Sequence, residues 1–256
     1  MDFQASGNQQ GNQDQGWGWN MRATPRAFAF THSRLTERDL AVVRWIGRQR
    51  FAAADQINRR FGMDRSRAYR RLRVCIAAGL LVHEQPFHGP GVYVTTQHGL
   101  ATVDLDLPPA RVDVRCYRHD LDLAGLCATY ELAGHQVVTE REIRTVDTHS
   151  DRPRYAVTLG GGRQHFPDLI LDTVEGLVAV ELERTAKRAR RLDHILAGYV
   201  RARHLTAVHY HATTPAVRRA LDGAIERVHA GQLISVLDVE DDQLTPPVMA
   251  AMGGNS

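Results

Sequence analysis

Three acidic residues and one lysine are spaced so that they can share a single site. Glu181 and Glu183 stand two residues apart in an apolar segment, and alternate side chains of a β-strand point to the same face. Asp168 begins the preceding predicted strand, which places it beside these two glutamates across a strand pair. Lys187 follows four residues after Glu183 and can fold back over the same edge. The spacing therefore predicts a cluster of three carboxylates and one ammonium.

This cluster has the composition of a metal-dependent hydrolytic site. Clustered carboxylates repel one another unless a cation neutralises them, and Mg²⁺ is the usual hard, oxygen-seeking partner. An ammonium above such a metal is suited to orienting a water and stabilising the charge that develops during phosphodiester hydrolysis. Asp168, Glu181, Glu183 and Lys187 are therefore the candidate catalytic residues.

Lys187 is also unusual because it is the only lysine in a chain with 31 arginines. An ammonium is a compact point charge that can approach a phosphate or a metal-bound water, whereas a guanidinium is a broad planar fork. A lysine retained by chance on a solvated helix face is the alternative, and the sequence leaves it open.

The positive charge of the chain is concentrated near its N-terminal end. The chain carries +3 formally, but residues 34–74 contain twelve arginines and four acidic residues, which gives this segment a charge of +8. Such an asymmetry favours a surface that attracts polyanions, nucleic acid in particular. Double-stranded DNA is the predicted partner.

The same segment shows helix signals followed by a hairpin. A capping box at Thr36 and Asp39 starts one helix, a second covers 52–61, and a third follows Asp64 with an apolar stripe and five arginines. Two strand-like runs, 80–84 and 92–95, enclose a loop rich in glycine and proline. This order predicts an N-terminal winged helix-turn-helix.

In a winged helix the third helix enters the major groove and the loop reaches the neighbouring backbone. The candidate DNA-binding residues share these two positions and are Arg65, Arg67, Arg70, Arg71 and His88. An ordinary solvated arginine face is the alternative, and winged helices also mediate protein contacts. The sequence also leaves open an interaction with a second copy of the chain or with another protein.

Beyond residue 111 the pattern changes to a mixed sheet flanked by helices, an α+β or α/β arrangement. We expect the following order: helix 118–133, strands 136–143, 166–171 and 176–183, helix 186–204, strand 206–211, helix 216–229 and strand 233–239. Lys187 would then begin the helix that follows the two glutamates.

This second part resembles the PD-(D/E)xK nuclease fold through Pro167, Asp168, the hairpin return and Glu181. Its combination with a winged helix is similar to the replication-relaxation family of bacterial plasmids and conjugative elements. The resemblance implies that Asp168 and Glu181 bind the metal, Mg²⁺ if the site is active. The nuclease pattern has a lysine two residues after the second acid, where this chain has Glu183, so Lys187 would have to act from the helix.

The predicted domains are a Gln/Asn/Gly-rich tail over 1–33, the winged helix over 34–110, the nuclease-like domain over 111–239 and a flexible tail over 240–256. No apolar run is long enough to span a membrane, the N-terminus is polar, and the three cysteines show no metal spacing, which favours a cytoplasmic protein.

Three functions remain open from the sequence. The first is a DNA-binding protein for replication, relaxation or transfer of mobile DNA, whose nuclease-like domain lacks robust activity. The second is an active Mg²⁺-dependent endonuclease. The third is a transcription regulator whose second domain dimerises or binds a partner. The first is favoured because Glu183 replaces the expected lysine.

Overall fold

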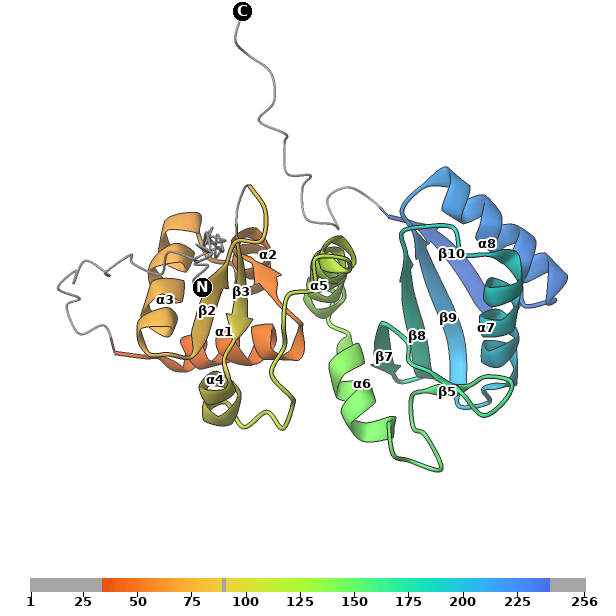
Figure 1. The fold of residues 1–256 in the computed structure, drawn as a ribbon, viewed down its shortest axis with the longest axis horizontal. Helices are drawn as coiled ribbons and strands as arrows, with labels where there is room; N and C mark the ends of the chain where they lie inside the picture. The colour runs from red at the N-terminus through yellow and green to blue at the C-terminus, as the bar shows by residue number, and fades with distance from the viewer. Residues whose placement is uncertain (1–33, 89–90, 240–256) are drawn as a thin grey trace, which may run out of the picture. The chain divides into compact units, whose positions relative to one another are not determined.

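The computed structural model describes residues 34–88 and 91–239, and the two predicted tails lie outside these ranges. Helices and mixed sheets alternate along the described chain, so the α+β prediction is confirmed (Figure 1). None of the helices in these ranges is long and apolar enough to cross a membrane. The described residues all fall within one compact unit.

Three helices come first along the described chain, and each has a local signal for its start or end. α1 (Glu37–Arg48) begins at the predicted capping box, in which Thr36 and Asp39 cap each other's backbone. α2 (Ala54–Phe61) ends at Gly62, whose φ of 56° is the left-handed conformation that glycine adopts without strain. α3 (Arg65–Ala77) is capped by the Asp64 carboxylate, which accepts the backbone N–H of Arg67 at 2.8 Å.

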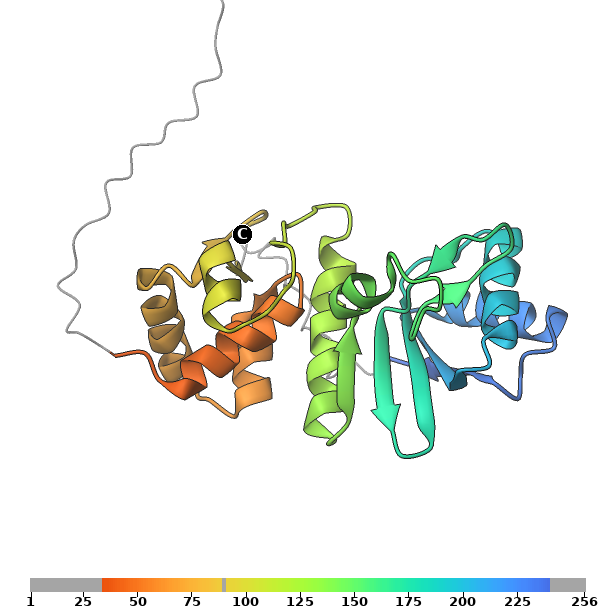
Figure 2. The same cartoon turned by 90° about the horizontal axis from the view of Figure 1, so that it is seen from below.

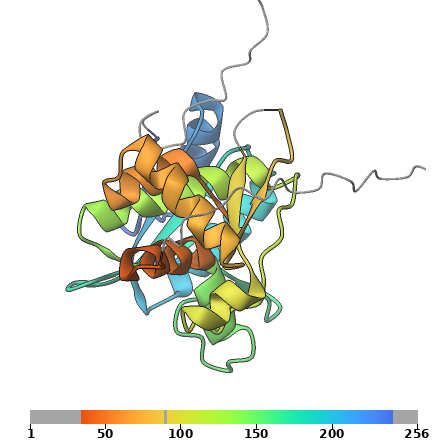
Figure 3. The same ribbon diagram turned by 90° about the vertical axis from the view of Figure 1, so that its left-hand side faces the viewer.

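A small sheet completes this first part. β1 (Ala52–Ala53), β2 (Leu81–Glu84) and β3 (Val92–Thr95) are antiparallel and lie in the order β1-β3-β2. The first two residues of the predicted helix 52–61 are therefore strand, because they pair with Tyr93 and Val92. α4 (Gln97–Thr102) follows, and Figure 3 views the molecule from this side.

The second part is built on a five-stranded sheet in the order β10-β9-β8-β7-β4. Its strands are β4 (Gln136–Thr139), β7 (Leu169–Thr173), β8 (Gly176–Glu183), β9 (Leu205–Ala212) and β10 (Ile234–Asp238). The first three are antiparallel neighbours, whereas β8, β9 and β10 run parallel. β5 (Val157–Thr158) and β6 (Gln164–His165) form a separate hairpin.

Helices cover both faces of this sheet (Figures 1 and 2). α5 (Tyr117–Leu132) packs through Leu123, Leu126 and Cys127 on the face that carries Val180 and Leu182. α7 (Ala189–Arg201) and α8 (Pro215–Arg227) cover the opposite face, to which Glu181 and Glu183 belong by strand alternation. The two glutamates therefore share one face, as the period-two pattern predicts.

Two further predicted elements need correction. The strand expected over 136–143 ends at Thr139, because Thr139 and Glu142 form a capping box that starts α6 (Glu140–Asp147). The helix expected from 186 begins at Ala189, because the chain must first turn from the end of β8 before it can cross back over the sheet. Lys187 therefore lies in a loop and not on a helix.

Candidate functional site

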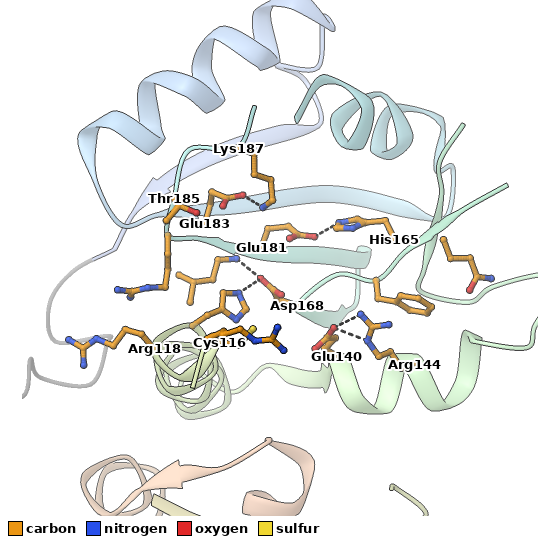
Figure 4. A pocket seen from close by; sticks show the side chains of 16 residues that line it. Cys116, Arg118, Glu140, Arg144, His165, Asp168, Glu181, Glu183, Thr185 and Lys187 are labelled. Atoms are coloured by element: carbon orange, nitrogen blue, oxygen red, sulfur yellow. Dashed lines mark hydrogen bonds and ion pairs between the residues drawn. The ribbon is translucent and has the colours of Figure 1, made fainter. Parts of the chain in front are cut away.

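A pocket of about 530 Å³ lies where α5, α6, the β5–β6 hairpin and the end of β8 meet (Figure 4). All four predicted catalytic residues line it: Asp168, Glu181, Glu183 and Lys187. The sequence prediction that these side chains come together agrees with this placement, although their catalytic role stays a prediction.

Asp168 is held by a backbone bond and by a histidine. It immediately precedes β7, and its Oδ2 accepts the backbone N–H of Leu182 at 2.8 Å. The same oxygen lies 3.3 Å from Nε2 of His119, a residue of the first turn of α5. Figure 4 shows this carboxylate directed into the pocket below the glutamates.

Glu181 is 6% exposed, and its side chain has two partners. Its Oε1 lies 2.7 Å from Nε2 of His165 and accepts the hydroxyl of Tyr199 from α7. Burial by itself raises the pKa of Glu181, but the charge and hydrogen bonds of these partners outweigh burial and lower it. Glu181 is therefore held as a carboxylate.

The two histidines are the cations of these pairs. Burial lowers the pKa of His119, but its hydrogen bonds to Asp120 and Asp168 outweigh this and raise the pKa to about 10. The pKa of His165 is raised likewise, because the charge and hydrogen bond of Glu181 exceed the effect of burial. Both pairs thus place a protonated imidazole beside a carboxylate.

Glu183 and Lys187 form the third pair. The Lys187 ammonium contacts Oε2 of Glu183, although Lys187 comes from a loop. Burial raises the pKa of Glu183, and the charges of Glu181 and Asp168 add to this, so the pKa stays raised despite the lysine. Lys187 therefore reaches the pocket, where it pairs with the residue that stands in the expected lysine position.

Arginines line the rest of the pocket, and most of them already have an acidic partner. Arg115 pairs with Asp113, Arg144 with Glu140, and Arg184 with Asp122. Arg118 lines the same pocket and forms no ion pair with any residue in the described ranges. Burial and the charge of Arg118 together lower the pKa of Arg184. An anion entering the pocket would meet these two cations.

Asp168 and Glu181 have carboxylate oxygens of the kind that bind a magnesium ion. Asp168 and Glu181 each have one carboxylate oxygen engaged and a second that accepts no hydrogen bond from a described residue. Mg²⁺ is commonly held by one or two carboxylates, with waters and substrate phosphates filling the remaining positions. Across residues 34–88 and 91–239, no group of three or more His, Cys, Asp or Glu side chains is arranged to hold a metal.

His119 and His165, which line the pocket, and Tyr199, which contacts Glu181 from α7, are residues that sequence reasoning missed. His119 lies 49 residues from Asp168, and no spacing rule connects them. His165 has a weak signal, because it stands two residues before Pro167 at the edge of the predicted strand. Tyr199 lies within the predicted helix 186–204, and only the packing of α7 on the sheet brings its hydroxyl to Glu181.

The predicted DNA-binding residues fall into two groups. Arg65, Arg67 and Arg70 of α3 are exposed, and His88 is exposed in the loop between β2 and β3. Arg71 differs because its guanidinium binds the carboxylate of Asp39, with Nε at 2.7 Å from Oδ1. The structure thus places Arg71 in an internal ion pair, while the others point away from the core.

Several arginines of the +8 segment are turned inward. Arg48 pairs with Glu131 at 2.6 Å and Glu142 at 2.9 Å, and Arg60 also pairs with Glu131. Arg50 pairs with Glu140 at 2.9 Å. Part of the positive charge of residues 48–60 is therefore balanced by acids of α5 and α6, whereas Arg65, Arg67 and Arg70 of α3 form no ion pair with a described residue.

Comparison with known proteins identifies a family. Residues 43–217 match the family described as replication-relaxation, a match that covers more than half of the 256-residue chain. No curated protein and no solved structure matches the chain. The chain belongs to the replication-relaxation family, which indicates a role in the replication or relaxation of mobile-element DNA.

Proposed function

We propose that this protein binds duplex DNA through α3 and the β2–β3 loop, as an accessory factor in replication, relaxation or transfer of a bacterial plasmid or conjugative element. The observation that carries the proposal is the exposed arginine face of α3. Arg67 and Arg70 form no ion pair or side-chain hydrogen bond with any described residue, so both remain available for an external polyanion.

The order of elements around α3 supports the same proposal. α1, α2 and α3 precede the β2–β3 hairpin, which is the order of a winged helix. The loop of this hairpin carries His88 and Phe87, and the Phe87 ring packs edge-on against Tyr117 at 5.0 Å between centroids. That contact gives the loop a fixed anchor beside the start of α5, suited to a second contact with the DNA backbone.

The experiment is a duplex-binding titration by fluorescence anisotropy. We expect Arg67→Ala/Arg70→Ala to weaken binding by about 100-fold, because each lost phosphate contact removes counterion release. The matched control is Arg190→Ala/Arg219→Ala, two exposed arginines of α7 and α8 that form no ion pair or side-chain hydrogen bond with a described residue, and it should stay within about threefold of wild type. Unchanged affinity in the α3 variant would refute the proposal.

A second candidate, Mg²⁺-dependent DNA cleavage, is favoured by the convergence of Asp168, Glu181 and Lys187 in one pocket. A bound Mg²⁺ would activate a water and stabilise charge on a phosphodiester. Asp168 and Glu181 would hold the ion through their unengaged oxygens, while Lys187 would hold a phosphate oxygen or orient the water. His119 and His165 would orient the two carboxylates.

The pairing within the pocket makes us favour DNA binding over cleavage. Lys187 is engaged by Glu183, and each carboxylate already has a cationic neighbour, so catalysis would require these pairs to rearrange. The test is incubation of supercoiled, linear and single-stranded DNA with Mg²⁺ or Mn²⁺, comparing wild type with Asp168→Asn, Glu181→Gln and Lys187→Ala. Cleavage that all three variants lose would establish the nuclease, and absence of cleavage by wild type would leave the binding function.

A further inference from the structure

A second cavity, of about 550 Å³, lies between the β5–β6 hairpin and the C-terminal half of α7. Its side chains include Arg201, Arg203, His194 and His204, and no carboxylate from the described residues lines it. The pocket described above has four acidic residues in its lining that balance its cations, and the second cavity differs from it by having cations alone. A concave site that collects cations without acids attracts anions.

The two arginines of this cavity are not used elsewhere. Neither Arg201 nor Arg203 forms an ion pair or side-chain hydrogen bond with a residue in the described ranges, and both are exposed. At the end of α7 the carbonyl of Tyr199 accepts the backbone N–H of Ala202 at 3.0 Å, so this carbonyl needs no arginine as a partner. The two guanidiniums are therefore free to bind a ligand at this helix end.

His194 supplies an independent sign of a ligand. Its Nε2 is buried and has no hydrogen-bond partner among the described residues. A buried ring nitrogen without a partner is costly, and an acceptor entering the cavity would relieve that cost when Nε2 carries the proton. The Nε2 thus offers a donor in addition to the two guanidiniums.

Two glycines bring the hairpin onto the helix and shape the cavity. A Cβ on Gly198 would lie 2.5 Å from Cδ2 of Leu159, and one on Gly160 would lie 2.9 Å from Cε1 of His194. Both distances are shorter than ordinary contacts, so larger residues would push the hairpin away from α7. The close approach keeps His194 and the arginines around one space.

We propose that this cavity binds a phosphate group, either of a nucleic-acid backbone or of a free phosphorylated compound. Guanidinium forks match the oxygens of a phosphate, and the two arginines together with Nε2 of His194 suit its charge better than that of a single carboxylate. The inference does not depend on DNA binding by α3, because it rests on residues of α7 and the β5–β6 hairpin.

Isothermal titration calorimetry of the full chain with inorganic pyrophosphate tests this site. We expect wild type and the control Arg190→Ala/Arg219→Ala to bind alike, and Arg201→Ala/Arg203→Ala to bind at least about tenfold more weakly. His194→Gln should also weaken binding. Circular dichroism establishes that the variants are folded. Absence of pyrophosphate binding by wild type, or equal binding by all variants, would overturn the proposal.

A duplex-DNA arm distinguishes the two sources of the phosphate. If the site takes the nucleic-acid backbone, Arg201→Ala/Arg203→Ala should lower the slope of log affinity against log salt by about 1 to 2. If it takes a free phosphorylated compound, pyrophosphate binding is lost while that slope is unchanged. Arg67→Ala/Arg70→Ala should retain pyrophosphate binding under either outcome, which separates this site from the proposed DNA-binding face.

Discussion

The arginines of α1 and α2 and those of α3 come from one basic stretch of sequence, yet they differ in what lies opposite them. Arg48 and Arg60 face the carboxylate of Glu131, which is 7% exposed, whereas Arg67 and Arg70 face no acid in the described chain. Charge counted along the sequence therefore overstates the charge that a ligand meets. The inward arginines hold α1 and α2 against α5 and α6, and the outward ones are left to attract a polyanion.

The pocket that contains Asp168 and Glu181 extends this comparison. Its carboxylates are matched by His119, His165 and Lys187 in the same way that Glu131 is matched by arginines. Most charged side chains of this pocket therefore have a partner of opposite charge. The exposed arginines of α3 and of the cavity at the end of α7 have none among the described residues. The unpaired regions are accordingly the ones to which we assign ligands.

Charge reversal on α3 should produce the largest effect. Arg67→Glu/Arg70→Glu not only removes two cations but places two anions beside the phosphates, so duplex binding should weaken by more than about 1000-fold. The free energy of unfolding should stay within about 0.5 kcal/mol of wild type, because both side chains are exposed. Anisotropy and urea titrations measure the two quantities. Retained duplex binding would mean that the outward arginines of α3 do not bind DNA, and that they do not differ in this respect from the inward arginines of α1 and α2.

Removal of the acid that pairs with the inward arginines should lower stability and leave duplex binding unchanged. Glu131→Gln leaves Arg48 and Arg60 without the acid between them, and we expect a loss of about 2 kcal/mol in the free energy of unfolding. Duplex affinity should not change. The exposed Glu37→Gln, which breaks no ion pair, is the control. A Glu131→Gln protein as stable as wild type would show that these pairs do not hold the two parts together.

The pH dependence of stability should report the paired histidine of the pocket. The pKa of His119 in the folded protein is about 10, above the ordinary value near 6.5, so its stabilisation is complete below pH 6.5 and is lost as the pH rises towards 10. Wild type should lose about 3 kcal/mol more over this window than His119→Gln, because one pKa unit corresponds to about 1.4 kcal/mol. Urea titrations at pH 6.5, 8 and 9.5 measure this, and parallel pH profiles would argue against the pairing.

The smallest effect should come from Arg71, the one arginine of the predicted set that is paired. Asp39→Asn would release its guanidinium, and one additional cation on α3 should tighten duplex binding by about threefold. A loss of about 1 kcal/mol in stability should accompany it, because Asp39 also belongs to the capping box. Weaker DNA binding in this variant would mean that the Arg71–Asp39 pair shapes the DNA-binding face.

Local signals in the sequence were sufficient for much of the fold. The capping box at Thr36, the helix over 118–133 and the strand over 176–183 are found where they were predicted, because each rests on neighbouring residues. The strand alternation also placed Glu181 and Glu183 on one face. The strand over 136–143 failed because its last residues carry a competing capping box at Thr139.

Contacts between distant residues could not be predicted. Neither the pairing of His119 with Asp168 nor that of Arg48 with Glu131, 83 residues apart, has a spacing signal. Such pairs depend on how α5 packs between the sheet and α2, which single-sequence periodicity does not encode. The charge of the basic segment was visible in the sequence, but its division into inward and outward arginines required the structure.

The salt dependence of duplex binding tests the central claim most directly. The slope of log affinity against log salt counts the phosphates that the protein neutralises, at about 0.9 per contact on duplex DNA. We predict that Arg67→Ala/Arg70→Ala lowers the magnitude of this slope by about 2, while Glu131→Gln leaves it unchanged. A slope that is the same in wild type and in the α3 variant would contradict the account.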